Sequence, residues 1–447
     1  MLIKVREKIY LTGYTQEQAD KIKNKLTISN PLFVKKSNLK LALFGIDPTL
    51  KFYEEKDDTL IVPVGIFDEV KSLLPDHKII DNRFKNKNSL DIKFTGILRD
   101  YQEKAVNELS KYSNGVLEAI TASGKTLIIC ALIAKVKQPS LILVHTKELK
   151  DQFIDKLKKF TNINTVGTIG DTKYDIQDIT VALLQSMHRL SEEQYKELNN
   201  RFGFIYLDEA HIAPAETFYS ALNKLTALYK YGGSGTPYRT DGLTKVIFFV
   251  LGPIIHKVPI SDVKDYLSEI DYEQIETGYF FPMIASDEYT VMMNELTKDD
   301  KRNKFIADYA KDYLDKSCVF LSTRVQQLEE LQELLETGTI ITSKTPKKKR
   351  EKIIKDFLTK KINIIFSTYQ LFSTGLDIDH LEYLFFCAPM RSEIIIRQSV
   401  GRLMRKYIGK QAKIIDFVDT QLWVLKHQAR ARKKILENLK ESLLVNR

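Results

Sequence analysis

Residues 119–126 read Ala119-Ile120-Thr121-Ala122-Ser123-Gly124-Lys125-Thr126, and this stretch decides the fold. The apolar run Gly115–Ala119 before it predicts a strand, and the apolar run Thr126–Lys135 predicts a helix. A strand, a tight turn with glycine and then Lys-Thr at a helix start form the P-loop arrangement. Backbone N–H groups and the positive end of the helix dipole make such a turn a phosphate-binding site. A Gly-Lys-Thr in an ordinary loop is the alternative, because Ala119 stands where the usual pattern has its first glycine.

Two further features give this turn a chemical role. Lys125 would reach the β- and γ-phosphates of a nucleotide, and the Thr126 hydroxyl would hold Mg²⁺. Leu207-Asp208-Glu209-Ala210-His211 follows another predicted strand of the same block. Asp208 stands where a carboxylate would hold Mg²⁺, and Glu209 could polarise the attacking water as a general base. The two motifs together predict a site for ATP and Mg²⁺.

Composition narrows the class of protein. The chain has 447 residues, 43% hydrophobic and 28% charged, which is typical of a soluble globular protein of about three domains. The net charge of +10 suits a polyanion, most simply nucleic acid, although a basic protein without such a partner has the same charge. Three cysteines in apolar contexts predict neither disulfides nor a zinc site. No apolar run reaches about 18 residues, so we expect no membrane span, no signal peptide and a cytoplasmic location.

Residues 1–92 predict a small α+β module without a catalytic constellation. Apolar residues at the odd positions of Ile3–Leu11 alternate as in one half-buried strand, and Thr15 with Gln18 predicts a capped helix. Leu50–Glu54 and Thr59–Val64 predict a hairpin around a charged turn. The lysine-rich stretches of the module would contact phosphates or form solvated faces, and Asp81–Phe94 is the expected linker.

After the linker, strands and helices alternate in two blocks, which predicts two mostly parallel sheets with helices on both faces. The expected strands of the first block, residues 93–257, are Val116–Ala119, Leu141–His145, Ile179–Leu184, Phe204–Asp208 and Tyr229–Ser234. Those of the second block, residues 258–447, are Cys318–Ser322, Thr339–Thr342, Ile362–Ser367, Tyr383–Ala388 and Lys413–Phe417. A basic helix from about residue 421 is expected to end the chain. Ligands of such sheets bind at the carboxyl ends of the strands.

The second block contains Gln398-Ser399-Val400-Gly401-Arg402-Leu403-Met404-Arg405. Arg402 and Arg405, three residues apart, are expected to share one helix face. One interpretation is a solvent-exposed helix face on which the two arginines form salt bridges. The other is an arginine finger opposite the γ-phosphate, which contributes about 10³–10⁵ in rate.

These residues resemble a known family. Four segments resemble motifs I, II, III and VI of the superfamily 2 helicases and translocases, in the same order: Ala119–Thr126, Asp208–His211, Ser234–Pro237 and Gln398–Arg405. Leu98–Gln102 resembles the adenine-reading segment before motif I, and Thr368–Asp377 resembles motif V. The chain looks most like the phage UvsW-type recombination helicases, with the XPB and RecG types further off, because of Leu98–Gln102, Gly235–Arg239 and the basic N-terminal module. Ala122 departs from the pattern, since many members have glycine there.

The resemblance implies roles for individual residues. Residues around the nucleotide would be Arg99, Gln102, Thr121, Ala122, Ser123, Gly124, Lys125, Thr126, Gly375 and Asp377. Catalysis would use Lys125, Asp208, Glu209, Gln398, Arg402 and Arg405, with Mg²⁺ on Thr126 and Asp208. Coupling to the nucleic-acid path would use His211, Ser234 and Thr236. The nucleic-acid backbone would contact Thr146, Gln185, Ser186, Arg324 and Thr368, although Thr and Ser also cap helices.

The resemblance implies two tandem RecA-like P-loop lobes with parallel sheets after a small α+β domain. The expected activity is that of an ATP-dependent DNA helicase or duplex translocase that remodels branched DNA such as junctions, forks and R-loops, in recombination, repair and replication. One alternative is an RNA helicase of the same superfamily, because contacts to the phosphate backbone hardly distinguish DNA from RNA. Another is a catalytically silent nucleic-acid-binding scaffold, against which the intact Lys125, Asp208, Glu209 and Arg402 argue.

Overall fold

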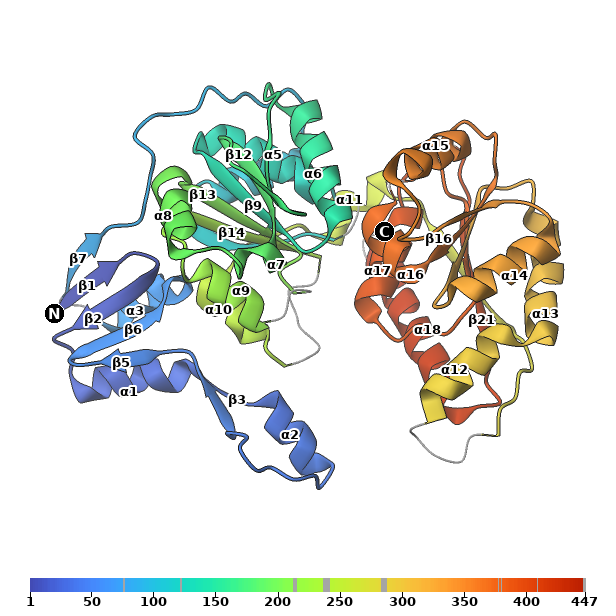
Figure 1. Cartoon of the computed structure of the whole chain (residues 1–447), viewed down its shortest axis with the longest axis horizontal. Coiled ribbons are helices and arrows are strands. Elements are labelled where there is room, and N and C mark those ends of the chain that lie inside the picture. The colour runs from blue at the N-terminus through green and yellow to red at the C-terminus, as the bar shows by residue number, and fades with distance from the viewer. Residues whose placement is uncertain are drawn as a thin grey trace. The chain divides into compact units, whose positions relative to one another are not determined.

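A computed structural model (Figure 1) describes residues 1–74, 77–120, 123–211, 215–235, 242–282, 288–376, 378, 380–407 and 409–444. It divides into two compact units, the first with most of residues 1–258 and the second with all of residues 259–447. Among the described residues, no helix combines the length and the apolar character that crossing a bilayer requires.

The first unit begins with a five-stranded sheet in the order β5-β6-β2-β1-β7. Its elements are β1 (Leu2–Val5), β2 (Lys8–Thr12), α1 (Gln16–Lys25), β5 (Glu54–Lys56), β6 (Thr59–Pro63), α3 (Phe67–Leu73) and β7 (Lys78–Asp81). The single strand predicted over Ile3–Leu11 is wrong, because β1 and β2 form an antiparallel hairpin. Ile3 pairs with Leu11 and Val5 with Ile9, so the alternation continues across the turn and all four side chains are buried on one face.

Local capping and turn signals were predicted better than strand length. The Thr15 hydroxyl accepts from the Gln18 amide, and the Gln18 side chain accepts from the Thr15 amide, which confirms the predicted capping box. The predicted hairpin exists, but its first strand is β5 rather than Leu50–Glu54, since Lys56 pairs with Thr59. Asp57 has φ +52°, which makes the turn tight enough for that register.

Residues 27–51 form an insertion between α1 and this hairpin. Its elements are β3 (Thr27–Ser29), α2 (Pro31–Asn38) and β4 (Thr49–Lys51), with β3 and β4 paired antiparallel. Figure 1 shows α2 beyond β3, extending away from the five-stranded sheet. The sequence analysis missed this helix, and no residue of α2 is buried.

The segment predicted as a linker, Asp81–Phe94, is bonded to the first lobe. The Phe84 amide donates to the Thr226 carbonyl (2.7 Å), and the Leu228 amide donates to the Phe84 carbonyl (2.8 Å). Phe94 forms an isolated bridge with Thr161. The segment therefore lies against the lobe as ordered chain, and the predicted domain boundary at residue 92 stays a prediction.

The first lobe has an eight-stranded sheet in the order β11-β10-β12-β9-β13-β14-β8-β15, parallel except for the β10–β11 pair. Its strands are β8 (Asn114–Glu118), β9 (Ser140–Val144), β10 (Gly167–Gly170), β11 (Lys173–Asp175), β12 (Ile179–Leu183), β13 (Phe204–Asp208), β14 (Tyr229–Ser234) and β15 (Ile254–Lys257). Its helices are α4 (Asp100–Leu109), α5 (Lys125–Val136), α6 (Lys147–Phe160), α7 (Leu184–Met187), α8 (Glu192–Arg201), α9 (Ala215–Leu222) and α10 (Thr244–Leu251). Since β13, β14 and β8 are neighbours, their carboxyl ends bring motifs II, III and I to one edge.

The second lobe has a six-stranded, all-parallel sheet in the order β16-β21-β20-β17-β19-β18. Its strands are β16 (Ile270–Glu276), β17 (Cys318–Ser322), β18 (Thr339–Ile341), β19 (Ile364–Thr368), β20 (Tyr383–Phe386) and β21 (Ala412–Val418). Its helices are α11 (Ile260–Val263), α12 (Tyr289–Lys298), α13 (Asp300–Ala310), α14 (Val325–Leu335), α15 (Lys347–Leu358), α16 (Tyr369–Gly375), α17 (Glu393–Leu403) and α18 (Trp423–Leu444). The predicted fold class is confirmed: two RecA-like lobes follow a small α+β part. The sequence analysis missed the edge strand β16, which alternates polar and apolar residues only weakly.

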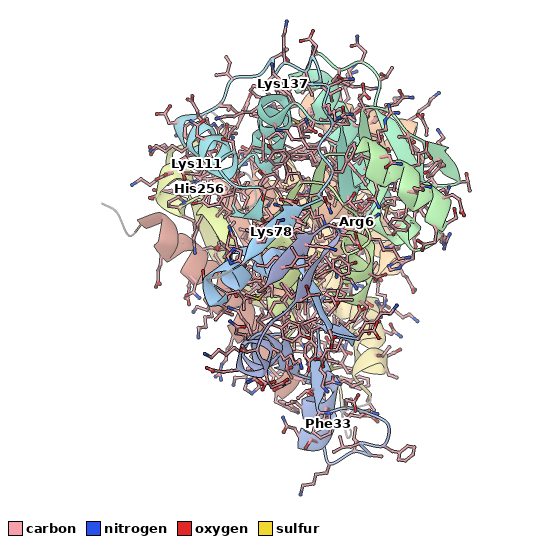
Figure 2. All side chains as sticks on the ribbon, turned by 90° about the vertical axis from the view of Figure 1, so that its left-hand side faces the viewer. Arg6, Phe33, Lys78, Lys111, Lys137 and His256 are labelled. Atoms are coloured by element: carbon pink, nitrogen blue, oxygen red, sulfur yellow. The ribbon has the colours of Figure 1, made fainter. Side chains whose placement is uncertain are left out.

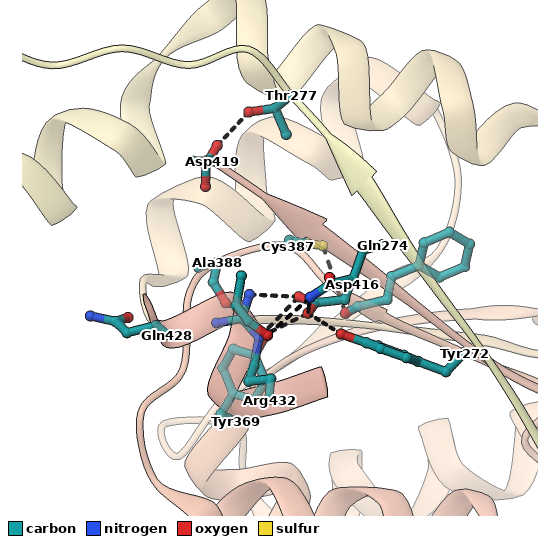
Figure 3. Close-up of polar contacts among 12 residues, drawn as sticks. Tyr272, Gln274, Thr277, Tyr369, Cys387, Ala388, Asp416, Asp419, Gln428 and Arg432 are labelled. Carbon is teal, nitrogen blue, oxygen red and sulfur yellow. Dashed lines mark hydrogen bonds and ion pairs between the residues drawn. The ribbon is translucent and has the colours of Figure 1, made fainter. Parts of the chain in front are cut away.

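Two buried ion pairs fasten helices to the second sheet, and Figure 3 shows the one at Asp416. The Arg432 guanidinium on α18 donates to both carboxylate oxygens of Asp416 on β21, at 2.8–3.1 Å. The Tyr272 hydroxyl on β16 donates to the same carboxylate at 2.8 Å. Arg302 on α13 donates to Asp419 at 2.8 and 3.0 Å. The Arg302–Asp419 pair joins segments 117 residues apart, whereas Asp416 and Arg432 lie on consecutive elements.

We expect Asp416→Ala to destabilise the second lobe by about 3–5 kcal/mol, because Arg432 would keep a buried charge without its carboxylate. Glu437→Ala, which removes the exposed partner of Lys433 on the same helix, is the matched control and should change stability by about 1 kcal/mol or less. Urea unfolding followed by circular dichroism measures both. Equal losses for the two variants would contradict the prediction.

Candidate nucleotide site and nucleic-acid contacts

The predicted phosphate-binding turn ends at Gly124, where helix α5 begins. Gly124 has φ +80° and ψ +36°, a left-handed conformation that costs glycine little. A Cβ atom at this position would lie 2.4 Å from Nε2 of Gln102. Glycine is therefore needed both for the turn and for the close approach of Gln102. Thr121 and Ala122 lie outside the described residues, so the effect of alanine at 122 stays a prediction.

Gln102 lies on α4 and is 3% exposed. Its Oε1 accepts from the Arg99 amide at 3.0 Å, which fixes the side-chain amide with Nε2 toward Gly124. The Arg99 guanidinium donates to the Tyr101 hydroxyl at 3.1 Å. The structure thus brings the segment before motif I against the phosphate-binding turn, although the two are separated by strand β8.

Lys125 joins the turn to the acidic motif. Its ammonium group lies 3.1 Å from Oε1 of Glu209 and donates to the Ala119 carbonyl at 3.1 Å. Asp208 is the last residue of β13 and is buried, and Glu209 follows it with φ +47°. A positive φ outside glycine stores strain, and such residues cluster at functional sites.

The two adjacent carboxyl groups have opposite pKa shifts. Burial, and then the charge of Glu209, raise the pKa of Asp208 to about 7. Burial also acts to raise the pKa of Glu209, but Lys125 and His211 outweigh it, so that pKa lies below its usual range. The single ammonium group of Lys125 therefore neutralises one of two carboxyl groups. The other carboxyl group, that of Asp208, is suited to a divalent cation. Together with the Thr126 hydroxyl it fits Mg²⁺, which usually takes its remaining ligands from phosphate and water.

A second chain of contacts leads from motif II to motif III. The His211 imidazole Nδ1 lies 2.6 Å from the Ser234 hydroxyl and 3.4 Å from Oε2 of Glu209. Glu209, His211 and Ser234 therefore form one connected group at the ends of β13 and β14. Thr236, with Pro237, Tyr238 and Arg239, lies outside the described residues.

The sequence analysis missed Tyr206 and His145. The Tyr206 hydroxyl donates to Oδ1 of Asp208 at 3.0 Å, and a Cβ atom on Gly233 would lie 1.9 Å from that hydroxyl. Two signals pointed there: Tyr206 is two residues before Asp208 on one strand, and the facing strand carries Gly232-Gly233. His145 follows β9, and burial lowers the pKa of its imidazole while the charge of Glu209 opposes that shift.

In the second lobe, Arg402 lies on α17 and is 6% exposed. Its guanidinium donates to the Ser373 carbonyl, at 2.9 Å from Nη2 and 3.3 Å from Nε, and to the Leu376 carbonyl. It therefore joins α17 to the end of α16, where motif V lies. Gln398 is buried on the same helix. Gly375 ends α16, and Asp377 lies outside the described residues.

The prediction that Arg402 and Arg405 share a helix face is wrong. Helix α17 ends at Leu403, and Arg405 forms an isolated antiparallel bridge with Leu267. The Ser268 amide donates to the Met404 carbonyl at 2.7 Å, so pairing with this segment replaces the next helical turn. Burial lowers the pKa of Arg405 to about 10, which still leaves the guanidinium charged at neutral pH.

The residues expected to contact a nucleic-acid backbone also have structural partners. The Thr146 hydroxyl caps α6 by accepting from the Leu149 amide (3.2 Å), and the Thr368 hydroxyl caps α16 by accepting from the Leu371 amide (3.5 Å). Arg324 donates to the Asn294 side chain at 3.0 Å. Gln185 and Ser186 lie on the short helix α7, with Gln185 exposed. Thr146, Thr368 and Arg324 therefore have structural partners, and their contacts to nucleic acid stay predictions.

Comparison with known proteins gives matches to both lobes. Residues 95–239 match the family described as "Type III restriction enzyme, res subunit", and residues 300–407 match "Helicase conserved C-terminal domain". "Putative ATP-dependent RNA helicase L396" of Acanthamoeba polyphaga mimivirus is 30% identical over 370 residues, covering 79% of this chain and 70% of that protein. "ATP-dependent DNA helicase uvsW" of Enterobacteria phage T4 is 26% identical over 345 residues, covering 72% and 68%.

Solved structures agree on the fold. S. cerevisiae Dbp5 bound to RNA and ADP BeF3 superposes with a TM-score of 0.54 at 15% identity, covering 75% of this chain and 87% of that chain. At this level of identity the similarity is evidence for the fold and not for the substrate.

Proposed function

Because the chain belongs to the superfamily 2 helicases and is an ATP-driven helicase, we propose that it translocates on DNA and remodels branched substrates such as junctions, forks and R-loops. The observation that supports a hydrolytic site is the convergence of Gln102, Gly124, Lys125, Asp208 and Glu209 at one sheet edge. We further propose three functional parts, residues 1–92, 93–257 and 258–447.

We propose that Lys125 changes partners when ATP binds. Lys125 neutralises Glu209 at 3.1 Å, and the β- and γ-phosphates would compete for its ammonium group. Lys125 is the chief group that lowers the pKa of Glu209, so its departure makes this carboxylate a stronger base, able to accept a proton from the attacking water. Thr126 and Asp208 would hold Mg²⁺, which when bound neutralises the charge that develops on the phosphates. Arg99 and Gln102 would contact adenine, and the backbone of 121–124 would cradle phosphate.

We propose that the second lobe supplies Arg402 and Arg405 to the γ-phosphate in the transition state, with Gln398 positioning water and Gly375 and Asp377 serving ribose and phosphates. Arg402 is buried, and Arg405 is half-buried with a pKa of about 10 that leaves it charged at neutral pH; an electrostatic interaction is strong where water is excluded. His211, Ser234 and Thr236 would transmit the nucleotide state to Thr146, Gln185, Ser186, Arg324 and Thr368 on the nucleic acid. The Glu209–His211–Ser234 contacts support the first of these steps.

A basic cavity of 1130 Å³ in the first unit supports a polyanionic substrate. Strand β2, residues 82–87 and α8 line it, with seven Lys and Arg residues against two Glu. Arg6, labelled in Figure 2, belongs to this lining. Lys85, Lys87 and Lys196 form no ion pair with any residue that the structure describes, so their charge is available to phosphates. The cavity involves the N-terminal part, as a DNA-binding role of residues 1–92 requires.

We expect Lys85→Ala with Lys196→Ala to weaken junction binding and to flatten the dependence of log Kd on log salt by about 2, because each phosphate contact to duplex DNA contributes a slope of about 0.9. Fluorescence anisotropy across a salt series measures this slope. Lys173→Ala on β11, an exposed lysine outside the cavity, is the control. An unchanged slope in the double variant would exclude this cavity as a phosphate-contacting surface.

One experiment tests the proposed function. ATP hydrolysis and strand separation are measured side by side on single-stranded DNA, duplex DNA, a four-way junction and an RNA–DNA hybrid. Strongest activity on branched DNA is the expected result. Stimulation by RNA alone would favour the RNA helicase, since the relatives include one described as an RNA helicase. Hydrolysis that no nucleic acid stimulates would refute the proposal.

A further inference from the structure

Residues 27–51, which we call the arm, form an ordered projection of the first unit. The Asn30 side chain caps α2 by accepting from the Leu32 amide (3.0 Å) and donates to the Asp47 carbonyl (2.8 Å). The Asn30 amide donates to the Pro48 carbonyl at 2.9 Å. These bonds tie the start of α2 to the strand that returns from it, so the arm holds its shape without a core of its own.

The arm exposes apolar side chains that a compact domain normally buries. Phe44 is fully exposed, at 100%, in the turn after α2, where Gly45 has φ +72°. Four more large apolar residues of the arm are exposed: Leu32, Val34, Leu39 and Leu41. Figure 2 shows Phe33 near the end of the arm, away from the five-stranded sheet. Five exposed large apolar side chains in one short segment are more than scattered single surface residues, and such a concentration of exposed apolar area marks a binding site.

The charge of the arm identifies the kind of partner. Between Pro31 and Ile46 the sequence has three lysines, Lys35, Lys36 and Lys40, and no acidic residue. None of the three forms an ion pair with a residue in the described part of the chain. A surface that combines a planar aromatic ring with unneutralised cations matches a nucleic-acid strand, whose bases stack on the ring while its phosphates meet the lysines.

We propose that the arm binds unpaired nucleobases where a duplex ends, with Phe44 as the stacking platform. This proposal rests on the DNA substrate of the proposed function and adds an element that contacts the bases themselves. Phosphate contacts alone would leave the exposed ring without a role, whereas an unpaired strand offers both the flat faces of its bases to the ring and its phosphates to the lysines. The Asn30 hydrogen bonds fix α2 relative to the returning chain of the arm. Stacking of a base on Phe44 would therefore hold a separated strand away from its complement.

A single-tryptophan reporter tests the contact directly. The chain has one tryptophan, Trp423, on α18, so Trp423→Phe combined with Phe44→Trp leaves one indole at the end of the arm. A forked DNA with unpaired single-stranded ends should quench the fluorescence of this indole, and a blunt duplex should quench it much less. Ile97→Trp in the same background is the matched control, because Ile97 is 91% exposed in the first unit and lies outside the arm. Equal quenching of the two reporters by the fork would overturn the proposal.

A functional variant separates the arm from the motor. Phe44→Ala should reduce strand separation on a fork about tenfold, as loss of one stacked base predicts, and should leave ATP hydrolysis at saturating single-stranded DNA unchanged. Ile97→Ala should change neither rate. Normal strand separation by Phe44→Ala, in a chain whose DNA-stimulated hydrolysis is intact, would overturn the stacking role of Phe44. Absence of DNA-stimulated hydrolysis in the parent chain would refute the proposed function rather than the arm.

Discussion

Replacing Lys125 by alanine is expected to abolish measurable ATP hydrolysis. The ammonium group lies 3.1 Å from Glu209 and 3.1 Å from the Ala119 carbonyl, at the start of the helix that would receive the phosphates. Without it, the phosphates lose their cation and Asp208 and Glu209 remain as two adjacent buried carboxyl groups. The pKa of Glu209 should then rise, because Lys125 is the chief group that lowers it. A steady-state assay with saturating DNA measures the rate.

Two controls distinguish chemistry from folding. Lys125→Arg keeps a positive charge beside the carboxylates but replaces the compact ammonium by a planar guanidinium, so it should preserve thermal stability and still fail to hydrolyse ATP. Lys135→Ala removes an exposed lysine of the same helix, which donates to Asn107, and should leave the rate unchanged. If Lys125→Ala hydrolysed ATP at a rate within tenfold of that of the parent chain, Lys125 would not be a catalytic residue.

Arg402→Ala is expected to lower the hydrolysis rate at least about 10³-fold while ADP and ATP bind nearly as before. An arginine finger acts on the transition state, so binding of ADP with aluminium fluoride should weaken by a similar factor. The structure adds a second consequence, because Arg402 also holds the Ser373 and Leu376 carbonyls at the end of α16. Loss of those hydrogen bonds alone would lower thermal stability and would not single out the transition-state analogue.

Arg397→Ala is the matched control for this prediction. Arg397 lies on the same helix and pairs with Glu393 at 2.8 Å in a partly exposed i,i+4 salt bridge, which is worth little. Its removal should leave both the rate and the affinity for the analogue unchanged. If Arg402→Ala lost stability but kept its affinity for ADP with aluminium fluoride, Arg402 would be a structural link between α17 and α16 and not the finger.

Signals that depend on near neighbours in the chain were predicted well. The capping box at Thr15, the strands β13 and β14 and the start of α5 after Gly124 follow from patterns of a few residues. Errors appeared where a distant segment competes with a local pattern. The alternation over Ile3–Leu11 is the same in one strand as in a hairpin, and α17 stops before Arg405 because Leu267 and Ser268 pair with that backbone.

The sequence by itself determined the two α/β lobes and the residues available for nucleotide chemistry. Both follow from hydrophobic periodicity and from short sequence motifs, which are local properties of the chain. Only the tertiary structure decided that Gln102 lies against Gly124, that Tyr206 supports Asp208 in the space left by Gly233, and that Arg402 holds the end of α16. It alone also revealed the exposed arm and the Arg432–Asp416 pair. These features depend on which strands are neighbours and which polar groups are buried together, and those relations arise only when the strands and helices pack against one another.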